Sequence, residues 1–321
     1  MTERNIDLSV IVVVYNQPQS LQLILRALLA QDFRGSYEII VTDDGSSPEL
    51  FHSCREEFNN NSIPIKYVWQ QHRYFRAAMA RNNGIKISKG KIILFLDGDL
   101  VPALDTLRKH SEAHTSPKMM VAGNRKWRGE LSDDTKLPTG PIEEMIKFLE
   151  SGSSTDEKSR QREKVERQRR REWLASPRPW RACFSGNVSV EWSPKVYFDD
   201  NFIGWGPEDL EFNHRLCVKH NYTPTYRDDI TTYHLETPDA VGNVFRTGVH
   251  KEIVMYMKNT FYFFDKCSEL PLDEVFFGFP RFVLDIAINT WRVVPRPTPN
   301  SYDLEKVVNK ARQWFIEYGG K

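Results

Sequence analysis

The chain has 321 residues, of which 40% are hydrophobic, enough for one large α/β domain or two smaller ones with a substantial core. Lys plus Arg (44) nearly balance Asp plus Glu (43), and the formal net charge of +1 gives no reason to expect a nucleic-acid partner. The four cysteines show no Cys-x-x-Cys spacing, which argues against a zinc site or a disulfide framework and favours reduced thiols in the cytoplasm.

No apolar stretch approaches the roughly 20 residues that a membrane-spanning helix needs. Residues 1–5 lead directly into a strand-like run, without the features of a signal peptide. We therefore expect a cytoplasmic protein. The aromatic run at 276–284 is interpreted as docking onto the main domain, and a peripheral membrane contact is the alternative.

Strand-like and helix-like segments alternate through the first hundred residues. Aliphatic runs predict buried strands at 8–14, 37–41, 63–69 and 92–96, and apolar spacing predicts helices at 20–29, 49–58 and 75–88. This alternation predicts a Rossmann-like, mostly parallel sheet flanked by helices. Ligands of such sheets bind at the carboxyl ends of the strands, where Tyr15, Asp43 and Asp97 all fall.

The second part of the chain is less regular. Helix-like spacing at 104–114 is followed by a strand-like run at 119–123, mixed strands and turns at 176–250, and aromatic-rich helical sequence at 251–321. Residues 157–172 hold eight basic and four acidic residues, with favourable pairs Glu163–Arg167 and Glu166–Arg170 four positions apart. We interpret this segment as a solvated helix or insertion; the alternative is a segment that covers or recruits a second substrate.

Two pairs of acidic residues are framed by glycine. Asp97-Gly98-Asp99 follows a buried strand, where two acids suit a divalent cation and the phosphates it holds. Glu208-Asp209 follows a Gly-Trp-Gly-Pro segment and offers a general base. A metal-binding carboxylate pair and a general base are the least that an enzyme needs to transfer an activated group from a diphosphate to a nucleophile. The alternatives are structural roles: Asp97-Gly98-Asp99 could form only a turn after the strand, and Glu208-Asp209 only the acidic first turn of a helix.

Six short motifs, in this order, resemble a known family. Residues 12–16, 41–46, 80–84 and 95–99 look like the nucleotide-sugar-binding half of GT-A-fold glycosyltransferases of the inverting family 2 type. Residues 204–212 resemble the acceptor-side motif of β-1,4-galactosyltransferases and chondroitin-polymerase-type enzymes, and residues 233–236 resemble their later metal-binding histidine segment. The resemblance covers about residues 7–240.

The resemblance implies a donor site at the strand ends. Its implied donor-binding residues are Tyr15 and Asn16 near the base, Asp43 and Asp44 on uracil or ribose, Arg81 near the base or diphosphate, Asp97 and Gly98 on ribose or sugar, and Asn187 and Trp205 at the sugar. Alternatives stay open: turn and cap chemistry for Asp43 and Asp44, a surface helix position for Arg81, and a core position for Trp205.

The resemblance also implies the metal and the catalytic groups. Asp99 and His234 would bind the cation, and the imidazole tilts the choice towards Mn²⁺ over Mg²⁺. Asp209 would deprotonate the acceptor while Glu208 holds sugar or acceptor hydroxyls, and attack opposite the diphosphate would invert the anomeric centre. A structural role is the alternative for His234.

The implied activity is metal-dependent, inverting transfer from a UDP-sugar to a glycan, a lipid-linked sugar or a small molecule. The implied organisation is a GT-A domain at 1–250, with a nucleotide-binding half at 1–100, an acceptor half at 101–250 carrying the charged insert near 151–175, and a helical extension at 251–321. A retaining transferase and a non-catalytic glycan-binding protein are the alternatives. A nucleotidyltransferase is disfavoured, because residues 15–18 form no Gly-rich basic loop.

Overall fold

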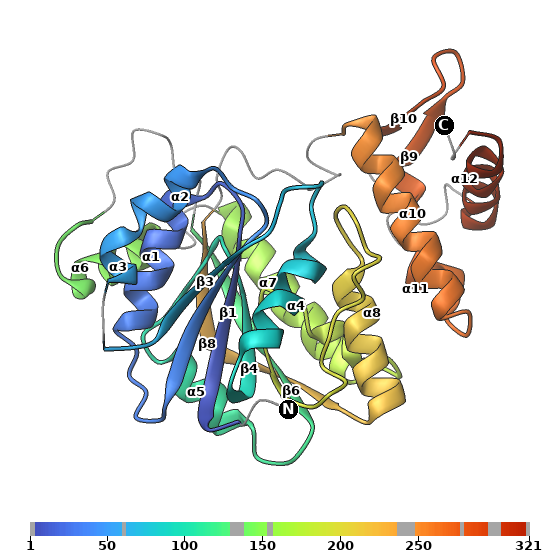
Figure 1. Cartoon of the computed structure of the whole chain (residues 1–321). Helices are drawn as coiled ribbons and strands as arrows, with labels where there is room; N and C mark the ends of the chain where they lie inside the picture. Colours follow the sequence, from blue (N-terminus) through green and yellow to red (C-terminus); the bar gives the residue numbers. More distant parts are fainter. Residues whose placement is uncertain are drawn as a thin grey trace.

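The computed structural model describes residues 4–59, 62–128, 138–152, 157–235, 248–276, 279–294 and 303–318. Its centre is an eight-stranded sheet with helices on its faces, in the strand order β3-β2-β1-β4-β7-β6-β8-β5 (Figure 1). This mixed α/β architecture confirms the predicted fold class. Glu236 and residues 277–278, which belong to two of the sequence motifs, lie outside the described residues.

The first half of the sheet is parallel, as the alternating pattern predicts. It contains β1 (Ile6–Val14), β2 (Tyr37–Asp43), β3 (Ile65–Trp69) and β4 (Gly90–Asp97), connected by α1 (Pro18–Leu29), α2 (Pro48–Ser53), α3 (Arg55–Phe58) and α4 (Ala77–Ile87). The helix predicted at 49–58 is interrupted at Cys54, which has non-helical backbone angles. Val14 pairs with Asp43 and Val13 pairs with Asp97, so two of the predicted acids flank the end of β1.

The second half of the sheet adds antiparallel pairs. It contains β5 (Leu100–Pro102), β6 (Met119–Arg128), β7 (Asn187–Glu191) and β8 (Thr223–Leu235), with α5 (Thr106–Ala113) between β5 and β6. β7 runs antiparallel to both β4 and β6, β8 is parallel to β6, and β5 is antiparallel to β8. The short β5 matters for function, because its pairing with β8 brings the residues after Asp97 beside the end of β8.

The segments between β6 and β8 are mostly helical. They are α6 (Ile142–Gly152), α7 (Glu157–Leu174), the 3₁₀ turn η1 (Pro179–Ala182), α8 (Glu208–His214) and the π-helical turn η2 (Arg215–Lys219). α7 coincides with the charged segment of the sequence. It is not only solvated, because Glu163 and Arg170 on it are 5% and 3% exposed.

The C-terminal extension comprises α10 (His250–Lys266), α11 (Leu272–Val275), η3 (Phe279–Arg281), β9 (Phe282–Asp285), β10 (Thr290–Val293) and α12 (Leu304–Tyr318). α10 stands beside α8 (Figure 1), and Ile253 and Tyr256 share a buried cluster with Phe202 and Leu210 of the sheet-bearing part. Phe276 and Phe282 of the predicted aromatic run belong to the same cluster, so the described part of that run docks as preferred from the sequence. The extension is not wholly helical: β9 and β10 form an antiparallel hairpin.

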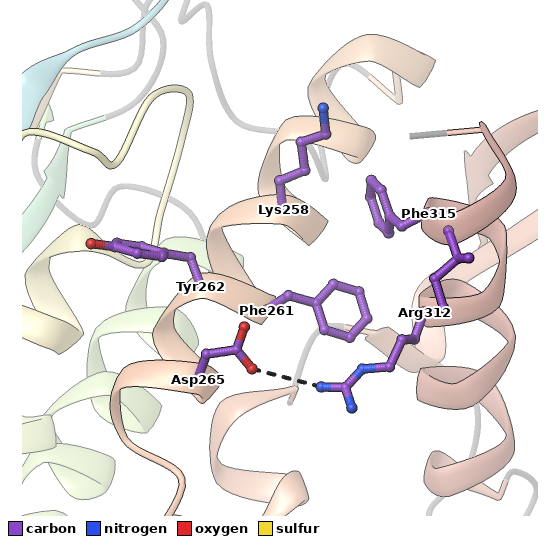
Figure 2. Close-up of a pocket in the computed structure, with 7 residues that line it drawn as sticks. Lys258, Phe261, Tyr262, Asp265, Arg312 and Phe315 are labelled. Atoms are coloured by element: carbon purple, nitrogen blue, oxygen red, sulfur yellow. Dashed lines mark ion pairs between the residues drawn. The ribbon is translucent and has the colours of Figure 1, made fainter. Parts of the chain in front are cut away.

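A surface hollow of about 590 Å³ lies between α10 and α12. Phe261 and Phe315 point into it from the two helices, and Arg312 forms an ion pair with Asp265 at 3.7 Å (Figure 2). It contains none of the residues predicted for the site. None of the helices in the described ranges is both long and apolar enough to cross a bilayer.

Candidate active site

The carboxyl ends of β1, β2 and β4 form the floor of the candidate site. Tyr15 and Asn16 follow β1 directly, and the Tyr15 ring stacks on His72 with centroids 4.4 Å apart. His72 in turn approaches the Asp44 carbonyl oxygen through Nδ1 at 2.9 Å. Asn16 has a positive φ of 49° and accepts a hydrogen bond from the Ser47 N–H through its side-chain oxygen. His72 lies in none of the sequence motifs, and only its place after β3 points to it.

The carboxylates of Asp43 and Asp44 are buried and engaged with their own loop. Asp43 accepts hydrogen bonds from the Ser46 N–H at 2.8 Å and from the Tyr67 hydroxyl. Asp44 accepts from Gln70 Nε2 at 2.6 Å and from the Arg76 N–H at 2.7 Å, and burial raises its pKa. The turn chemistry that was an alternative for these residues is therefore present, and it shapes the loop at the end of β2.

Arg81 joins the two acidic motifs. Its Nη2 lies 2.9 Å from Asp97 Oδ1 and its Nη1 lies 3.0 Å from Glu208 Oε1, while the whole residue is only 3% exposed. Burial alone would lower the pKa of Arg81, but the two carboxylates outweigh it and raise the pKa. The surface-helix alternative is wrong for this residue: it is a buried bridge on α4.

Asp99 and His234 meet because β5 pairs with β8. Leu100 is in register with His234, and Asp99 Oδ2 lies 3.4 Å from His234 Nε2. The His234 ring packs on Trp127 at 4.2 Å between centroids. Burial would raise the pKa of Asp99, but His234 outweighs it and lowers the pKa. A carboxylate and an imidazole this close together are ligand types that could hold a divalent ion such as Mn²⁺.

Asp209 lies in the first turn of α8 and is partly exposed, whereas Glu208 beside it is buried. Burial, and then the Glu208 carboxylate, raise the pKa of Asp209 to about 7, while Arg81 opposes the shift. One oxygen of Asp209 accepts from the Leu210 N–H at 2.8 Å. A carboxylate with a pKa near the working pH is suited to take a proton from a hydroxyl.

The Gly-Trp-Gly loop before α8 is tied to α10. Asn259 Nδ2 donates to the carbonyl oxygens of Ile203 at 3.0 Å and Gly206 at 2.7 Å, and Trp205 stacks on Tyr256 at 5.5 Å. Gly204 has a φ of +92°, a conformation that L side chains rarely adopt. The loop is therefore held against α10, and Trp205 is half-buried and so not at the core position that was its alternative. Sequence reasoning missed Asn259, which lies outside every motif.

Asn187 lies apart from this group. It is 5% exposed on β7, accepts from His110 Nε2 at 2.8 Å and donates to the Asn124 carbonyl at 3.2 Å. Its amide is used inside the sheet, so its geometry favours positioning the strand over contact with a donor. The neighbouring Gly186 is close to the site, since a Cβ there would lie 2.6 Å from Asp97 Oδ2.

α7 packs against β6, the strand that carries Arg125 and Trp127. Glu163 Oε1 accepts from the Trp127 N–H at 2.8 Å, and Glu166 pairs with Arg125 at 3.0 Å and with Arg170 at 2.9 Å. The predicted Glu166–Arg170 pair is confirmed. Arg125 also acts electrostatically on Asp99 and Asp97. The charged insert thus supports the strand that carries Trp127, the residue packed on His234.

A second cluster of metal-ligand types lies away from the strand ends. His214, Cys267 and Glu269 are close enough to be considered together. However, Cys267 Sγ meets His214 Nδ1 at 3.3 Å while Glu269 meets Nε2 at 3.3 Å. One ion cannot take both nitrogens of one imidazole, so we interpret this group as a hydrogen-bonded link between α8 and the end of α10.

Comparison with known proteins places these observations in a family context. A sequence profile described as "Glycosyl transferase family 2" matches residues 9–176. The chain is 32% identical over 253 residues to a hyaluronan synthase of Pasteurella multocida, an alignment that covers 73% of this chain and 25% of that protein. The chain therefore spans about a quarter of the length of this relative.

Two solved glycosyltransferase structures share the mixed α/β fold. One is the mannosyltransferase PcManGT from Pyrobaculum calidifontis in complex with GDP-Man and Mn²⁺, with 14% identity, a TM-score of 0.55, and coverage of 99% of this chain and 77% of that one. The other is S. aureus TarS 1-349 in complex with UDP-GlcNAc, with 15% identity, a TM-score of 0.52, and coverage of 97% and 73%. At sequence identities this low, the similarity to these two structures shows a shared fold only.

Proposed function

Because the chain belongs to glycosyl transferase family 2, we propose that it transfers a sugar from a UDP-sugar to an acceptor hydroxyl, with a divalent metal ion and inversion of the anomeric centre. The acceptor is a glycan, a lipid-linked sugar or a small molecule. A uridine donor and a glycan product are in keeping with the UDP-GlcNAc complex of TarS and with the hyaluronan synthase relative.

The observation that carries the proposal is the double ion pair of Arg81. It holds Asp97, at the end of the donor-side strand, and Glu208, beside the candidate base, on one buried guanidinium. That two acidic motifs 111 residues apart in the chain (208 minus 97) contact one guanidinium supports assigning them to a single site. Donor carboxylates and a base carboxylate at the same place are what sugar transfer from a nucleotide requires.

Each described side chain has a definite task in this mechanism. Asp99 and His234 would hold the metal ion, which would supply positive charge to the departing diphosphate. Asp209 takes the proton of the acceptor hydroxyl onto its carboxylate as the acceptor oxygen forms its bond to the anomeric carbon and the bond to the diphosphate breaks. Glu208, fixed by Arg81, holds hydroxyls of the sugar or acceptor, and Trp205 offers a ring face to a sugar.

The test is turnover of defined donors by the purified chain. A panel of UDP-sugars and GDP-sugars is incubated with Mn²⁺ or with EDTA and with oligosaccharide acceptors, and products are followed by mass spectrometry and by NMR of the new anomeric proton. We expect a product from a UDP-sugar, only with metal, and with the opposite anomeric configuration to the donor. Retention of configuration would remove the inverting mechanism, and product formed in EDTA would remove the metal.

A further inference from the structure

β8 leaves its regular pairing with β6 just before it reaches the candidate metal site. The last pair before the break is Gly123–Arg227, and the first pair after it is Asn124–Thr231. Residues 228–230 fall between these pairs and form a bulge with no counterpart on β6. Pairing then resumes and carries β8 to its candidate metal-binding histidine, so the shape of the bulge sets where that side chain lies.

The side-chain amide of Asn187, on β7, fills the break in the pairing. Its Nδ2 donates to the carbonyl oxygen of Asn124 on β6 at 3.2 Å and to that of Ile230 in the bulge at 3.4 Å. Gly123 makes room for this amide, because a Cβ at Gly123 would lie 2.2 Å from Nδ2. Buried carbonyl groups beside a break in a sheet need a donor, and Asn187 supplies one to both strands.

His110 of α5 fixes the direction in which this amide points. Its Nε2 lies 2.8 Å from Asn187 Oδ1, and its Nδ1 lies 2.9 Å from Ser189 Oγ. Burial lowers the pKa of His110 to about 3, so at pH 7 the ring is neutral and has one donor and one acceptor nitrogen. Because an amide oxygen can only accept, Nε2 donates to Asn187 and Nδ1 accepts from the Ser189 hydroxyl. The Asn187 nitrogen is thereby directed to the two carbonyl groups.

We propose that Asn187 is a positioning residue, which closes the bulge of β8 and so fixes His234 opposite Asp99, while His110 holds the Asn187 amide in place. His234 lies four residues beyond Ile230, and its Nε2 is 3.4 Å from Asp99 Oδ2, so loosening the bulge would change that distance. In this role Asn187 acts on the metal site and does not contact the donor sugar. The link to metal binding rests on the proposed function, whereas the position of His234 can be measured in metal-free protein.

The experiment compares variants of the whole chain that carry isotope-labelled histidine. Asn187→Leu and His110→Leu remove the two hydrogen-bonding groups at similar volume, and His110→Gln keeps an amide donor in place of Nε2–H. Ser9→Ala is the matched control, because the buried Ser9 hydroxyl on β1 donates to Glu38 Oε1 at 2.7 Å elsewhere in the same sheet. Melting curves check that each protein is folded.

Three quantities are measured on each variant. NMR correlation spectra report the ring nitrogens of His234 in metal-free protein, with His234→Gln used to assign the signals. Electron paramagnetic resonance of unbound Mn²⁺ gives the Mn²⁺ affinity in the presence of UDP. Titration calorimetry in EDTA gives the affinity for UDP without metal.

We expect the His234 ring signals to move in Asn187→Leu and His110→Leu, to return towards wild type in His110→Gln, and to stay unchanged in Ser9→Ala. Mn²⁺ should bind about 10–100-fold more weakly to Asn187→Leu and His110→Leu, the usual effect of removing a group that orients a metal ligand. UDP affinity in EDTA should be unchanged in all variants.

Unmoved His234 signals in folded Asn187→Leu, or an equal loss of Mn²⁺ affinity in Ser9→Ala, would overturn the positioning role. Loss of UDP affinity in EDTA together with unmoved His234 signals would instead make Asn187 a donor contact. If Asn187→Leu does not fold, the comparison of His110→Leu with His110→Gln decides the same question. A wild type that binds neither UDP nor Mn²⁺ would remove the proposed function, and the metal-free His234 signals would still decide the role of Asn187.

Discussion

The Nη1 atom of Arg81 on α4 lies 3.0 Å from Oε1 of Glu208 on α8. The second terminal nitrogen, Nη2, lies 2.9 Å from Asp97 at the end of β4. A single buried guanidinium therefore fixes the distance between the strand that ends in Asp97-Gly98-Asp99 and the helix that begins with Glu208-Asp209. In family terms Arg81 is expected near the donor base or diphosphate, but its geometry makes it first a positioning residue.

Replacing Arg81 should destabilise the fold as well as the site. Arg81→Gln would leave Glu208, whose side chain is 10% exposed, without its partner, and removing one member of a buried ion pair costs about 3–5 kcal/mol. Urea denaturation at pH 7 measures this loss. The exposed Arg73→Gln is the matched control and should stay within about 0.5 kcal/mol. If both variants unfold at the wild-type midpoint, the bridge carries no stabilising role.

Asp209 should set the pH dependence of transfer. Burial and then Glu208 raise the pKa of Asp209 to about 7; Asp97 adds to this shift and Arg81 opposes it. The proposed base is therefore mostly deprotonated only at pH values above about 7. The transfer rate should rise with pH through about 7 and then level off. Asp209→Asn should lose about 10²-fold or more in rate while UDP binding is retained. An Asn variant with wild-type turnover would exclude Asp209 as the base.

The same pKa makes an independent prediction about stability. The folded protein keeps the Asp209 proton up to about pH 7, whereas an unfolded aspartate releases it near pH 4, so the folded state binds more protons between these values. Stability from this group must therefore fall as pH rises from about 4 to about 7. Asp209→Asn, which cannot ionise, should be more stable relative to wild type at pH 8 than at pH 4. Denaturation midpoints of the two proteins at both pH values test this without any substrate.

How far the sequence could predict the site depends on whether residues act through strand order or through tertiary contacts. The placement of Asp43 and Asp97 at one sheet edge follows from aliphatic runs and parallel alternation, and the register Val14–Asp43 and Val13–Asp97 confirms it. The Arg81–Glu208 pair does not follow, because an arginine inside a helix pattern carries no information about a partner 127 positions away.

The burial of α7 was equally out of reach of local patterns. A helix with a strongly polar composition is expected to be solvated, yet Glu163 and Glu166 turn inward because the Trp127 N–H and the Arg125 guanidinium at the end of β6 need acceptors. Their spacing of three residues puts them on one helix face. That spacing alone does not predict burial, because it is equally compatible with a solvated face. The β9–β10 hairpin was missed for a related reason, since short apolar runs do not distinguish helix from strand.

Asp99 should be required for metal-dependent donor binding. In a thermal-shift titration with UDP, wild type should melt at a higher temperature with Mn²⁺ than with EDTA, because a ligand at about 100 times its Kd stabilises the folded state by about 2.7 kcal/mol. Asp99→Ala should lose the Mn²⁺-dependent rise in melting temperature, since it removes the carboxylate that faces His234 Nε2 at 3.4 Å. Asp273→Ala, at an exposed position on α11, is the control. A full Mn²⁺ effect in Asp99→Ala would exclude this residue as a ligand.

Asn259 should affect the acceptor side more than the donor side. Asn259→Asp keeps the shape of the side chain but removes the donor that holds the Ile203, Gly204 and Gly206 carbonyls, and each buried group left without a partner costs about 1–3 kcal/mol. We expect lower transfer and a higher acceptor KM, with UDP affinity unchanged. Steady-state kinetics with each substrate varied in turn separates the two effects, and Lys258→Ala on the same helix is the control. Equal losses in donor and acceptor affinity would mean that the loop is simply unfolded.

The ion pairs of Glu166 make α7 sensitive to acid. Burial alone would raise the pKa of Glu166, but Arg125 and then Arg170 outweigh it and hold the pKa at about 2. A carboxyl whose folded pKa lies below its unfolded value of about 4.3 stabilises the protein above that pH, by about 3 kcal/mol for this difference, and loses the contribution as pH falls towards 2.

Glu166→Gln should therefore be destabilised at pH 7 by up to about 3 kcal/mol, and the gap to wild type should close towards pH 2. Denaturation curves at a series of pH values measure the gap, and Glu172→Gln, an exposed glutamate on the same helix, should show none of it. A pH-independent gap would mean that Glu166 contributes packing and no charge.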